Sequence, residues 1–289
     1  MPPSRRCWSG WRPRATSAAT GAATPIAIHL EGPFVSHIKR GVHPEADILP
    51  PDIALFDRFQ QAAGGHIRLI TIAPETPGAL NLIRHCAQQG VRASIGHTNA
   101  SSEESHAAIE AGAQSATHTY NAMRPLNHRE PGVLGTVLDS DILFAELICD
   151  GIHVAPELVR LWLKAKGPQR AILVTDSMAA AGMPDGEYTL GTFAVRVADG
   201  RAFAADDLTK GQHTLAGSVL TLDRAVANLQ QFTGASLEVA TGLASFNPAF
   251  LLGLERAIAY IAPGQPANFN VFTAAGELQD TILRGTALA

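Results

Sequence analysis

The stretch "IHLEGPF", residues 28–34, begins as an apolar β-strand and ends on a Gly-Pro breaker. It places the carboxylate of Glu31 at the end of that strand, and the next cationic residue along the chain is Lys39. An unpaired buried carboxylate costs several kcal/mol, so the group needs a cation, a proton or a metal ion. Loops at the carboxyl ends of strands carry the chemistry of α/β proteins. The stretch therefore predicts a metal site at a strand end.

Around this stretch, apolar runs alternate with amphipathic segments. Candidate strands are Ile26–Leu30, Ile67–Ile72, Val91–Ile95, Ser115–Thr119, Leu143–Cys149 and Ala171–Thr175. Candidate helices lie between most of them, at Pro51–Ala63, Gly78–Gln89, Ser102–Ala111 and Pro156–Lys166. Such alternation predicts parallel βαβ units and an α/β fold.

The pattern changes near Gly186, where apolar and polar residues alternate around an Asp-Gly turn and predict a hairpin. Helices are expected at Leu220–Phe232 and Leu237–Thr241, with a further helical turn after Pro248. Residues 267–288 are again hairpin-like. Antiparallel pieces beside a parallel barrel predict a small β-rich appendage.

Composition excludes several classes of protein. The chain has 289 residues, of which 46% are hydrophobic and 17% charged, which fits one large globular domain with a small appendage. The net charge of −4 and the lack of a long basic run give no reason to expect nucleic acid or a membrane as partner. Three widely spaced cysteines, Cys7, Cys86 and Cys149, favour a reducing cytoplasmic location over a disulfide framework.

Five of the six candidate strands end on a polar residue that strand ends seldom carry. These residues are Glu31, His97 in "SIGHT", His118 in "THTYNAM", His153 in "CDGIHV" and Asp176 in "VTDSM". In a (β/α)₈ barrel the carboxyl ends of the strands converge on one site. Two imidazoles and a carboxylate suit a divalent transition metal, and a nearby free carboxylate can take a proton from water.

Each of these residues also has a purely structural interpretation. A histidine after an apolar strand can be a core residue bonded to backbone, and Asp176 can be a helix N-cap. His29 shares a strand face with Glu31 and could either support the site or pack in the core. Helices or loops carry the other histidines, for which a structural role is expected: residues 37, 66, 85, 106, 128 and 213.

The motifs "HLEGPF", "GHTNAS", "THTYNAM", "DGIHV", "VTDSM" and "LAGS" occur in this order and resemble the N-acetylglucosamine-6-phosphate deacetylase family of the amidohydrolase superfamily. The resemblance runs from about Ile26 to the C-terminus. It implies a distorted TIM barrel with a small β-sandwich built from both chain ends. It also implies hydrolysis of the acetamide of N-acetyl-D-glucosamine 6-phosphate, in amino sugar catabolism.

The resemblance also implies roles for individual residues. Glu31, His97 and His118 match the metal ligands, with one zinc or iron ion per subunit, and Asp176 matches the general base. His153 matches a substrate ligand that polarises the acetyl carbonyl. Positions that hold the sugar phosphate, or lie beside the acetyl group, are matched by Val42, His43, Asn121, Ala122, Arg129, Leu215, Ala216, Gly217 and Ser218.

Relatives of this family begin with more chain, and an eight-stranded barrel would place Glu31 on its third strand. We therefore expect a barrel that lacks its first two strands, with residues 26–262 forming the barrel and 263–289 the C-terminal strands of a partial sandwich. Residues 1–25 carry four arginines and no acidic residue. They are expected to be disordered, non-native or, less in keeping with their pattern, a transit peptide.

Two alternatives to the glucosamine deacetylase stay open at this stage. One is an N-acetylgalactosamine-6-phosphate deacetylase, and the other is an inactive truncated remnant. The resemblance further implies an amino sugar phosphate as ligand and a homodimer as assembly.

Overall fold

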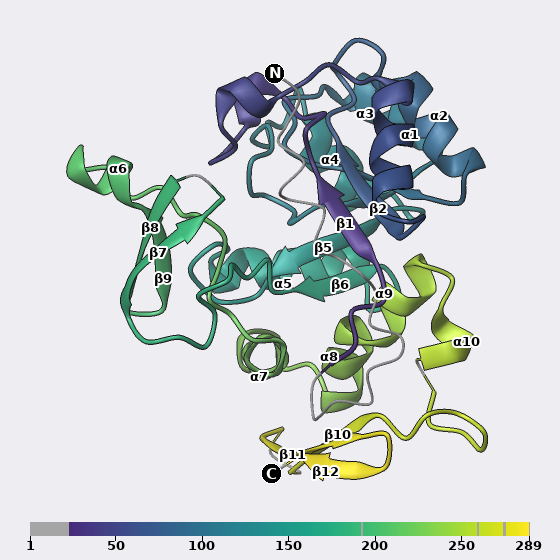
Figure 1. Ribbon diagram of the computed structural model, residues 1–289, viewed down its shortest axis with the longest axis vertical. Helices are drawn as coiled ribbons and strands as arrows, with labels where there is room; N and C mark the ends of the chain where they lie inside the picture. The colour runs from purple at the N-terminus through teal and green to yellow at the C-terminus, as the bar shows by residue number, and fades with distance from the viewer. Residues whose placement is uncertain (1–22, 192, 259, 274–275, 289) are drawn as a thin grey trace.

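The computed structural model describes residues 23–191, 193–258, 260–273 and 276–288 (Figure 1). A curled, six-stranded parallel sheet lies at its centre, and the strand order follows the sequence. Its strands are β1 (Ile28–Glu31), β2 (Ile67–Ile72), β3 (Arg92–Ile95), β4 (Ala113–Ala116), β5 (Phe144–Ile148) and β6 (Ala171–Val174). Within the described ranges β1 and β6 pair with one neighbour each, so this sheet has two edges.

Helices follow the first five strands and cover the outside of the sheet. They are α1 (Ile53–Ala62), α2 (Ala79–Gln88), α3 (Ser102–Ala111), α4 (Gly132–Asp139) and α5 (Pro156–Lys166). The Asp52 side chain caps α1 by accepting the Leu55 N–H, and Ser101 and Glu104 form a capping box on α3. Short 3₁₀ helices, η1 (His37–Lys39) and η2 (Glu45–Asp47), lie between β1 and α1.

The core lies on both faces of the sheet, as parallel sheets require. Strand β2 shows this directly, because five of its six residues are buried. Trp162 on α5 and Phe56 on α1 are fully buried against the outer face. The sheet and its helices thus form one continuous hydrophobic cluster.

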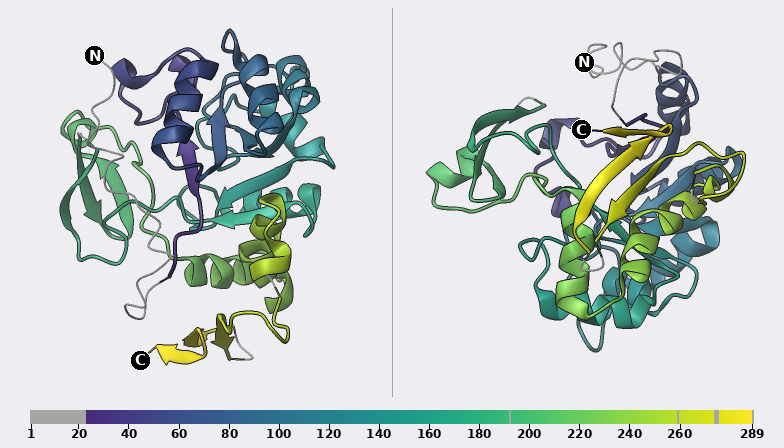
Figure 2. Two further views of the ribbon diagram at one scale, coloured as in Figure 1. Left: turned by 45° about the vertical axis from the view of Figure 1, so that its right-hand side comes forward. Right: turned by 90° about the horizontal axis from the view of Figure 1, so that it is seen from below.

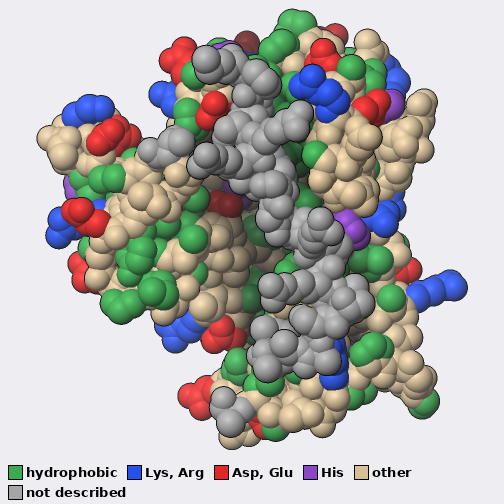
Figure 3. All heavy atoms as spheres, viewed as in Figure 1, with side chains coloured by type: hydrophobic (Ala, Val, Ile, Leu, Met, Phe, Trp, Pro, Cys, Tyr) green, Lys and Arg blue, Asp and Glu red, His purple; other side chains and the backbone are tan. Residues whose placement is uncertain are grey.

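Two smaller antiparallel sheets lie apart from each other on the outside of this unit (Figure 2). The first comprises β7 (Gly186–Leu190), β8 (Phe193–Ala198) and β9 (Arg201–Ala204), followed by α6 (Ala205–Thr209). The second comprises β10 (Phe269–Phe272), β11 (Leu278–Leu283) and β12 (Thr286–Leu288). Four helices connect them, α7 (Leu222–Thr233), α8 (Leu237–Ala244), α9 (Phe246–Leu251) and α10 (Glu255–Ile258). On the face shown in Figure 3, acidic and basic side chains are interspersed.

Several sequence expectations need correction. No helix was expected between the candidate strands Ser115–Thr119 and Leu143–Cys149, yet α4 forms there; its two glycines and its valines hid the helical pattern. The strand expected at Ser115–Thr119 ends at Ala116, so His118 lies in the following loop. The expected hairpins are three-stranded sheets. Most of the distinctive N-terminal segment, residues 1–22, lies outside the described residues, and the domain boundaries stay a prediction. In the described parts of the chain, no helix is both long and apolar enough to cross a bilayer.

Gly96 and Gly242 provide a matched test of the packing. A Cβ on Gly96 would stand 2.7 Å from Thr117 Cβ and 2.9 Å from Thr71 Cγ2, whereas nothing lies within 4 Å of a Cβ on Gly242. We expect Gly96→Ala to lower the free energy of unfolding by about 1–3 kcal/mol, because the added Cβ would overpack the interior of the curled sheet. Gly242→Ala, inside α8, should raise it by about 0.5–1 kcal/mol. Urea unfolding measures both changes, and equal effects would contradict the described packing.

Candidate metal centre

The candidate site lies at the carboxyl edge of the central sheet. Glu31 is the last residue of β1, and His97, His118 and Asp176 each stand two residues beyond the ends of β3, β4 and β6. His97, His118 and Asp176 have positive φ angles of 46°, 30° and 48°. Non-glycine residues seldom adopt this conformation, and it concentrates at functional sites. The rim of the sheet is therefore bent locally to turn these side chains together.

Glu31, His97 and His118 form a tight group. The Nε2 atoms of both histidines lie 2.8 Å from the same oxygen, Glu31 Oε1, and 3.1 Å from each other. Both histidines are buried, and the side chain of Glu31 is 28% exposed. Ligand atoms bound tetrahedrally to one zinc ion at about 2.0–2.2 Å stand about 3.3–3.6 Å apart, so side-chain shifts of roughly half an ångström would open this spacing for a shared cation.

The hydrogen bonds around His97 show why this group needs a cation. His97 Nδ1 lies 2.9 Å from the carbonyl oxygen of Lys39, which only accepts hydrogen bonds. The neutral ring therefore carries its proton on Nδ1, and the lone pair of Nε2 faces Glu31 Oε1. Two facing lone pairs repel unless a proton or a metal ion lies between them. Carboxylate and neutral imidazole are donors that zinc accepts, so the residues fit a divalent metal.

The charges of the group reinforce each other. Burial opposes the charged form of His118, but its hydrogen bond to Glu31 and the charge of that residue raise the pKa of His118 to about 9. Burial also opposes ionisation of Glu31, yet the hydrogen bond from His118 and the close approach of His97 hold its pKa well below the usual value. The site therefore favours a carboxylate paired with positive charge. Among the described residues, none is a hydrogen-bond partner of the buried Nδ1 atom of His118.

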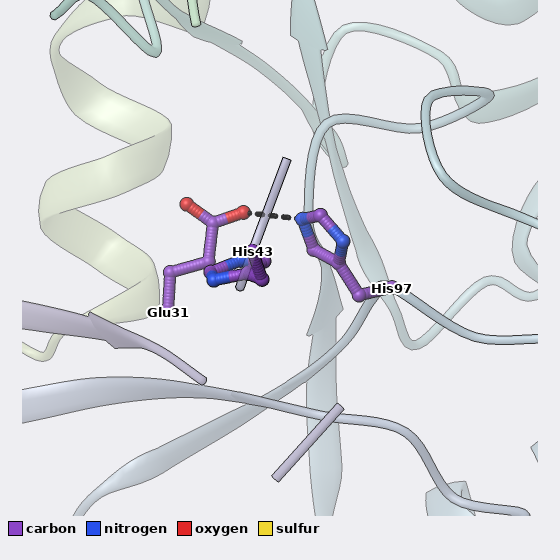
Figure 4. A group of neighbouring side chains, drawn as sticks. All are labelled: Glu31, His43 and His97. Carbon is purple, nitrogen blue, oxygen red and sulfur yellow. Dashed lines mark hydrogen bonds and ion pairs between the residues drawn. The ribbon is translucent and has the colours of Figure 1, made fainter. Parts of the chain in front are cut away.

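His43 is a further nitrogen donor close to this group. The ligand atoms of Glu31, His43 and His97 lie within 4.8 Å of one another (Figure 4). The rings of His43 and His97 meet edge to face with centroids 4.7 Å apart. Burial, then the charge of His97, lower the pKa of His43, which keeps its ring neutral. Because His118 approaches Glu31 and His97 much more closely, we favour His118 as the third ligand and leave His43 to the substrate.

The carboxyl group of Asp176 interacts electrostatically with the charges of Glu31, His97 and His118. Burial raises the pKa of Asp176 to about 6, and the negative charge of Glu31 adds to the rise. The segment Leu215–Ser218 packs beside it: Ser218 N donates to Asp176 O at 2.8 Å, and Met178 N donates to Ser218 O at 2.9 Å. Gly217 has a φ of 64°, and a Cβ there would stand 3.2 Å from Asp176 O. The loop is therefore held tightly against the backbone of Asp176.

His153 is oriented by a residue that sequence reasoning missed. Asp150 Oδ2 lies 2.6 Å from His153 Nδ1, while Asp150 Oδ1 accepts the N–H groups of Ile152 and His153 at 2.8 Å each. Burial opposes ionisation of Asp150, but the hydrogen bond from His153 lowers its pKa. A carboxylate behind an imidazole fixes the tautomer. The D-x-x-H spacing in "DGIHV" was the available signal.

The other predicted substrate residues lie in three places: the loop after β4, the region beside the β7–β9 sheet, and an exposed position at Arg129. Asn121 donates its backbone N–H to His118 O at 3.0 Å, and Ala122, at a φ of 50°, follows in the same loop. Val42 packs against the hydrophobic cluster of the β7–β9 sheet, which also contains Ala216. Leu215 bridges to Phe203 of β9. Arg129 is exposed, and within the described residues the structure does not bring its guanidinium into an ion pair.

His29 belongs to a chain of hydroxyl groups inside the sheet. Its Nε2 lies 2.8 Å from Thr71 Oγ1, which lies 2.8 Å from Thr117 Oγ1, and Thr117 donates to Ser94 Oγ at 2.7 Å. Because the Thr117 proton is used on Ser94, Thr71 donates to Thr117 and His29 donates to Thr71. His29 itself is the exposed end of this chain of hydrogen bonds. Its role is thus to support the interior beneath Glu31.

Two hollows of the described surface lie away from this site. One of about 620 Å³ lies beside α8 and α9, and one of about 700 Å³ lies between α7, α8, α10 and β10. None of the site residues lines either hollow. The candidate site is therefore identified by its side chains and not by cavity size.

Known proteins resemble the chain over most of its length. It is 40% identical over 275 residues to N-acetylglucosamine-6-phosphate deacetylase of Bacillus subtilis (strain 168), covering 95% of the chain and 68% of the relative. It is 36% identical over 263 residues to N-acetylgalactosamine-6-phosphate deacetylase of Escherichia coli O157:H7, covering 91% of the chain and 68% of the relative. The chain spans about two thirds of the length of the curated relatives that it matches.

Solved structures show the same likeness. N-acetyl-D-glucosamine-6-phosphate deacetylase from Mycobacterium smegmatis, in complex with N-acetyl-D-glucosamine-6-phosphate, superposes with a TM-score of 0.85 at 37% identity, covering 91% of this chain and 68% of that one. The sequence pattern of the amidohydrolase family matches residues 14–288. Together with the polar residues at the strand ends, this match shows that the chain belongs to the amidohydrolase family.

Proposed function

We propose that the chain hydrolyses the acetamide of N-acetyl-D-glucosamine 6-phosphate to D-glucosamine 6-phosphate and acetate. The observation that carries the proposal is the meeting of Glu31 Oε1 with the Nε2 atoms of His97 and His118. Relatives that carry this enzyme name, at 33–40% identity, support the choice of substrate. A six-stranded, amidohydrolase-type sheet positions the groups.

Glu31, His97 and His118 would hold one zinc or iron ion. When bound, such an ion lowers the pKa of water and offsets negative charge on the acetyl oxygen. The residues contribute in distinct ways: the Lys39 carbonyl fixes the His97 tautomer, so that Nε2 offers a lone pair. The shared Glu31 oxygen brings both imidazoles to one point.

Asp176 is the proposed general base. A carboxyl group whose pKa lies near 6 can take a proton from the attacking water and return it near neutral pH. A C–O bond then forms at the acetyl carbon as the C–N bond breaks, and Asp176 passes the proton to the leaving nitrogen. The products are acetate and the sugar amine: one proton of the water reaches the nitrogen through Asp176, and the second, lost from acetic acid, is taken up by the amine, which leaves as an ammonium group, so atoms and charge balance.

His153 is the proposed electrophile for the acetyl oxygen. Asp150 occupies its Nδ1–H, so Nε2 donates a hydrogen bond only when the ring is protonated. An imidazolium held against a buried carboxylate supplies positive charge where the oxyanion develops. His43, Asn121, Arg129 and the Ala122 loop are proposed to hold the sugar phosphate, because a guanidinium suits a phosphate dianion.

We further propose a homodimer located in the cytoplasm, with no nucleic acid or membrane as partner. These statements follow from the family resemblance and from the composition, and they stay predictions. Size-exclusion chromatography with light scattering of the purified chain tests the assembly.

Asp176→Asn tests the base directly. We expect kcat for acetate release, with zinc added, to fall on the order of 10³-fold or more, because the amide cannot accept the proton. The acid limb of kcat/KM, expected below about pH 6, should disappear, since a base must be deprotonated to act and a bound cation lowers its pKa further. Asp206→Asn, on exposed α6, is the matched control. Equal acetate release by both variants would remove Asp176 as the base.

Asp150→Asn tests the orientation and charge of His153. The asparagine amide would face Nδ1 and move the ring proton to Nε2, leaving a neutral imidazole. We expect kcat to fall by about 10²-fold with a smaller change in KM, because positive charge at the oxyanion is lost. Steady-state kinetics measure both, and a change confined to KM would contradict this role.

The galactosamine epimer is a second candidate substrate. The 36% identity to an N-acetylgalactosamine-6-phosphate deacetylase favours testing it. The metal group would serve either epimer, since the two sugars differ only at one hydroxyl. We expect kcat/KM to be at least about tenfold higher for the glucosamine substrate, the size of one hydrogen-bond difference. Acetate release from both epimers decides, and the reverse order would reassign the substrate.

A further inference from the structure

Glu75 follows β2, the one central strand for which the sequence suggested no site residue. Both oxygens of its carboxylate accept hydrogen bonds from the protein. Glu75 Oε2 accepts the Thr98 hydroxyl at 2.5 Å, and Glu75 Oε1 accepts the Asn99 N–H at 2.6 Å. Across the described chain, no lysine or arginine forms an ion pair with it. Both oxygens are thus committed to the two residues that follow His97.

Thr98 carries these bonds into two loops. It is fully buried, and its hydroxyl also accepts the Ala100 N–H at 3.0 Å. Its backbone N–H donates to Ala122 O, and its carbonyl accepts Arg124 N–H, both at 3.0 Å. Thr98 is thereby joined to the loop that begins with His118. Glu75 therefore holds the loop after β3 and, through Thr98, the loop after β4.

These loops need such support. His97, His118 and Ala122 have φ angles of 46°, 30° and 50°. A non-glycine residue in this region costs of order 1–3 kcal/mol and persists only where its surroundings enforce it. Hydrogen bonds that a carboxylate accepts are about twice as strong as neutral ones. The two bonds to Glu75 are placed directly after His97.

A glutamate that only caps a helix would also accept a backbone N–H, and Glu104 is such a residue. Glu104 Oε2 accepts the Ser101 N–H at 2.8 Å, and Ser101 Oγ accepts the Glu104 N–H at 3.1 Å. This capping box holds the far end of the same loop onto α3. It does not reach Thr98 or the loop after β4. Glu104 is therefore a matched structural control for Glu75.

We propose that Glu75 is a positioning residue for the metal group: its carboxylate fixes Thr98 and Asn99 and so sets the separation of the His97 and His118 imidazoles. This inference rests on the metal site of the proposed function. It assigns to Glu75 no contact with the ion or the substrate. Its effect is on the geometry of the ligands before any ion is bound.

Hydrogen–deuterium exchange of the metal-free protein tests the mechanical part. In Glu75→Ala the amides of residues 98–99 and 124 should exchange at least about tenfold faster, because local opening is no longer opposed by the carboxylate. In Glu104→Ala the faster exchange should be confined to residues 101–104. Unchanged exchange at residue 124 in Glu75→Ala would overturn the link between the two loops.

Zinc binding tests the functional part, by competition with a chromophoric chelator and by the visible spectrum of the cobalt-loaded protein. Glu75→Ala should weaken zinc binding by about 10–100-fold, as loss of supporting partners does, and Glu104→Ala by less than about threefold. Glu75→Gln should retain most of the affinity, because its oxygen accepts Asn99 N–H and its amide donates to Thr98. If Glu75→Ala does not fold, Glu75→Gln takes its place in these measurements.

The outcomes separate this inference from the proposed function. If the unsubstituted chain binds zinc but Glu75→Ala binds it as tightly, with the same cobalt spectrum, Glu75 is not a positioning residue while the metal site stands. If Glu75→Ala and Glu104→Ala lose affinity equally, the effect is general destabilisation and the inference falls. If the unsubstituted chain binds no zinc, both proposals fall.

Discussion

One carboxylate oxygen and two imidazole nitrogens face one another at the carboxyl edge of the sheet, and the rest of the structure depends on holding them there. Glu31 Oε1 and the Nε2 atoms of His97 and His118 lie within 3.1 Å, and without the proton on His118 each would offer a lone pair to the same point. Their mutual repulsion disappears only when positive charge sits among them. Holding these atoms together without a cation is electrostatically unfavourable, so rigid surroundings must stabilise the arrangement. The burial of both histidines and the fixed ring of His97 are those surroundings.

The support comes from the strand ends themselves. Backbone at positive φ turns His97, His118 and Asp176 inward, and bonds from neighbouring loops hold these turns. His97 and Asp176 each rest on a polar group from another loop, and His153 rests on an aspartate of its own loop. The Lys39 carbonyl holds His97, Asp150 holds His153, and Ser218 holds Asp176. Neighbouring loops at the carboxyl edge of the sheet therefore support one another's functional side chains.

The sequence predicted the parallel α/β arrangement and the residues at the strand ends because both leave local signals. Strand β2 and helices α3 and α5 were predicted with their observed bounds, since their caps and periodicities are strong. Helix α4 was missed because glycine and valine disguise its pattern, and the strand before His118 was predicted three residues too long at its C-terminal end. Asp150 and Glu75 were missed for different reasons. The role of Glu75 depends on contacts between loops, which no local pattern encodes, whereas Asp150 left a local signal, the D-x-x-H spacing, that was not recognised.

The order of strands in the central sheet has a consequence for how the rim is assembled. Each strand pairs with the one that precedes it in the chain, from β1 to β6. During synthesis the N-terminal strands leave the ribosome first. The three proposed metal ligands lie within residues 31–118, whereas Asp176 and residues 215–218 emerge later. An ion offered to the nascent chain would meet the proposed ligands before the proposed base is synthesised, so that metal supply would act on maturation earlier than on turnover.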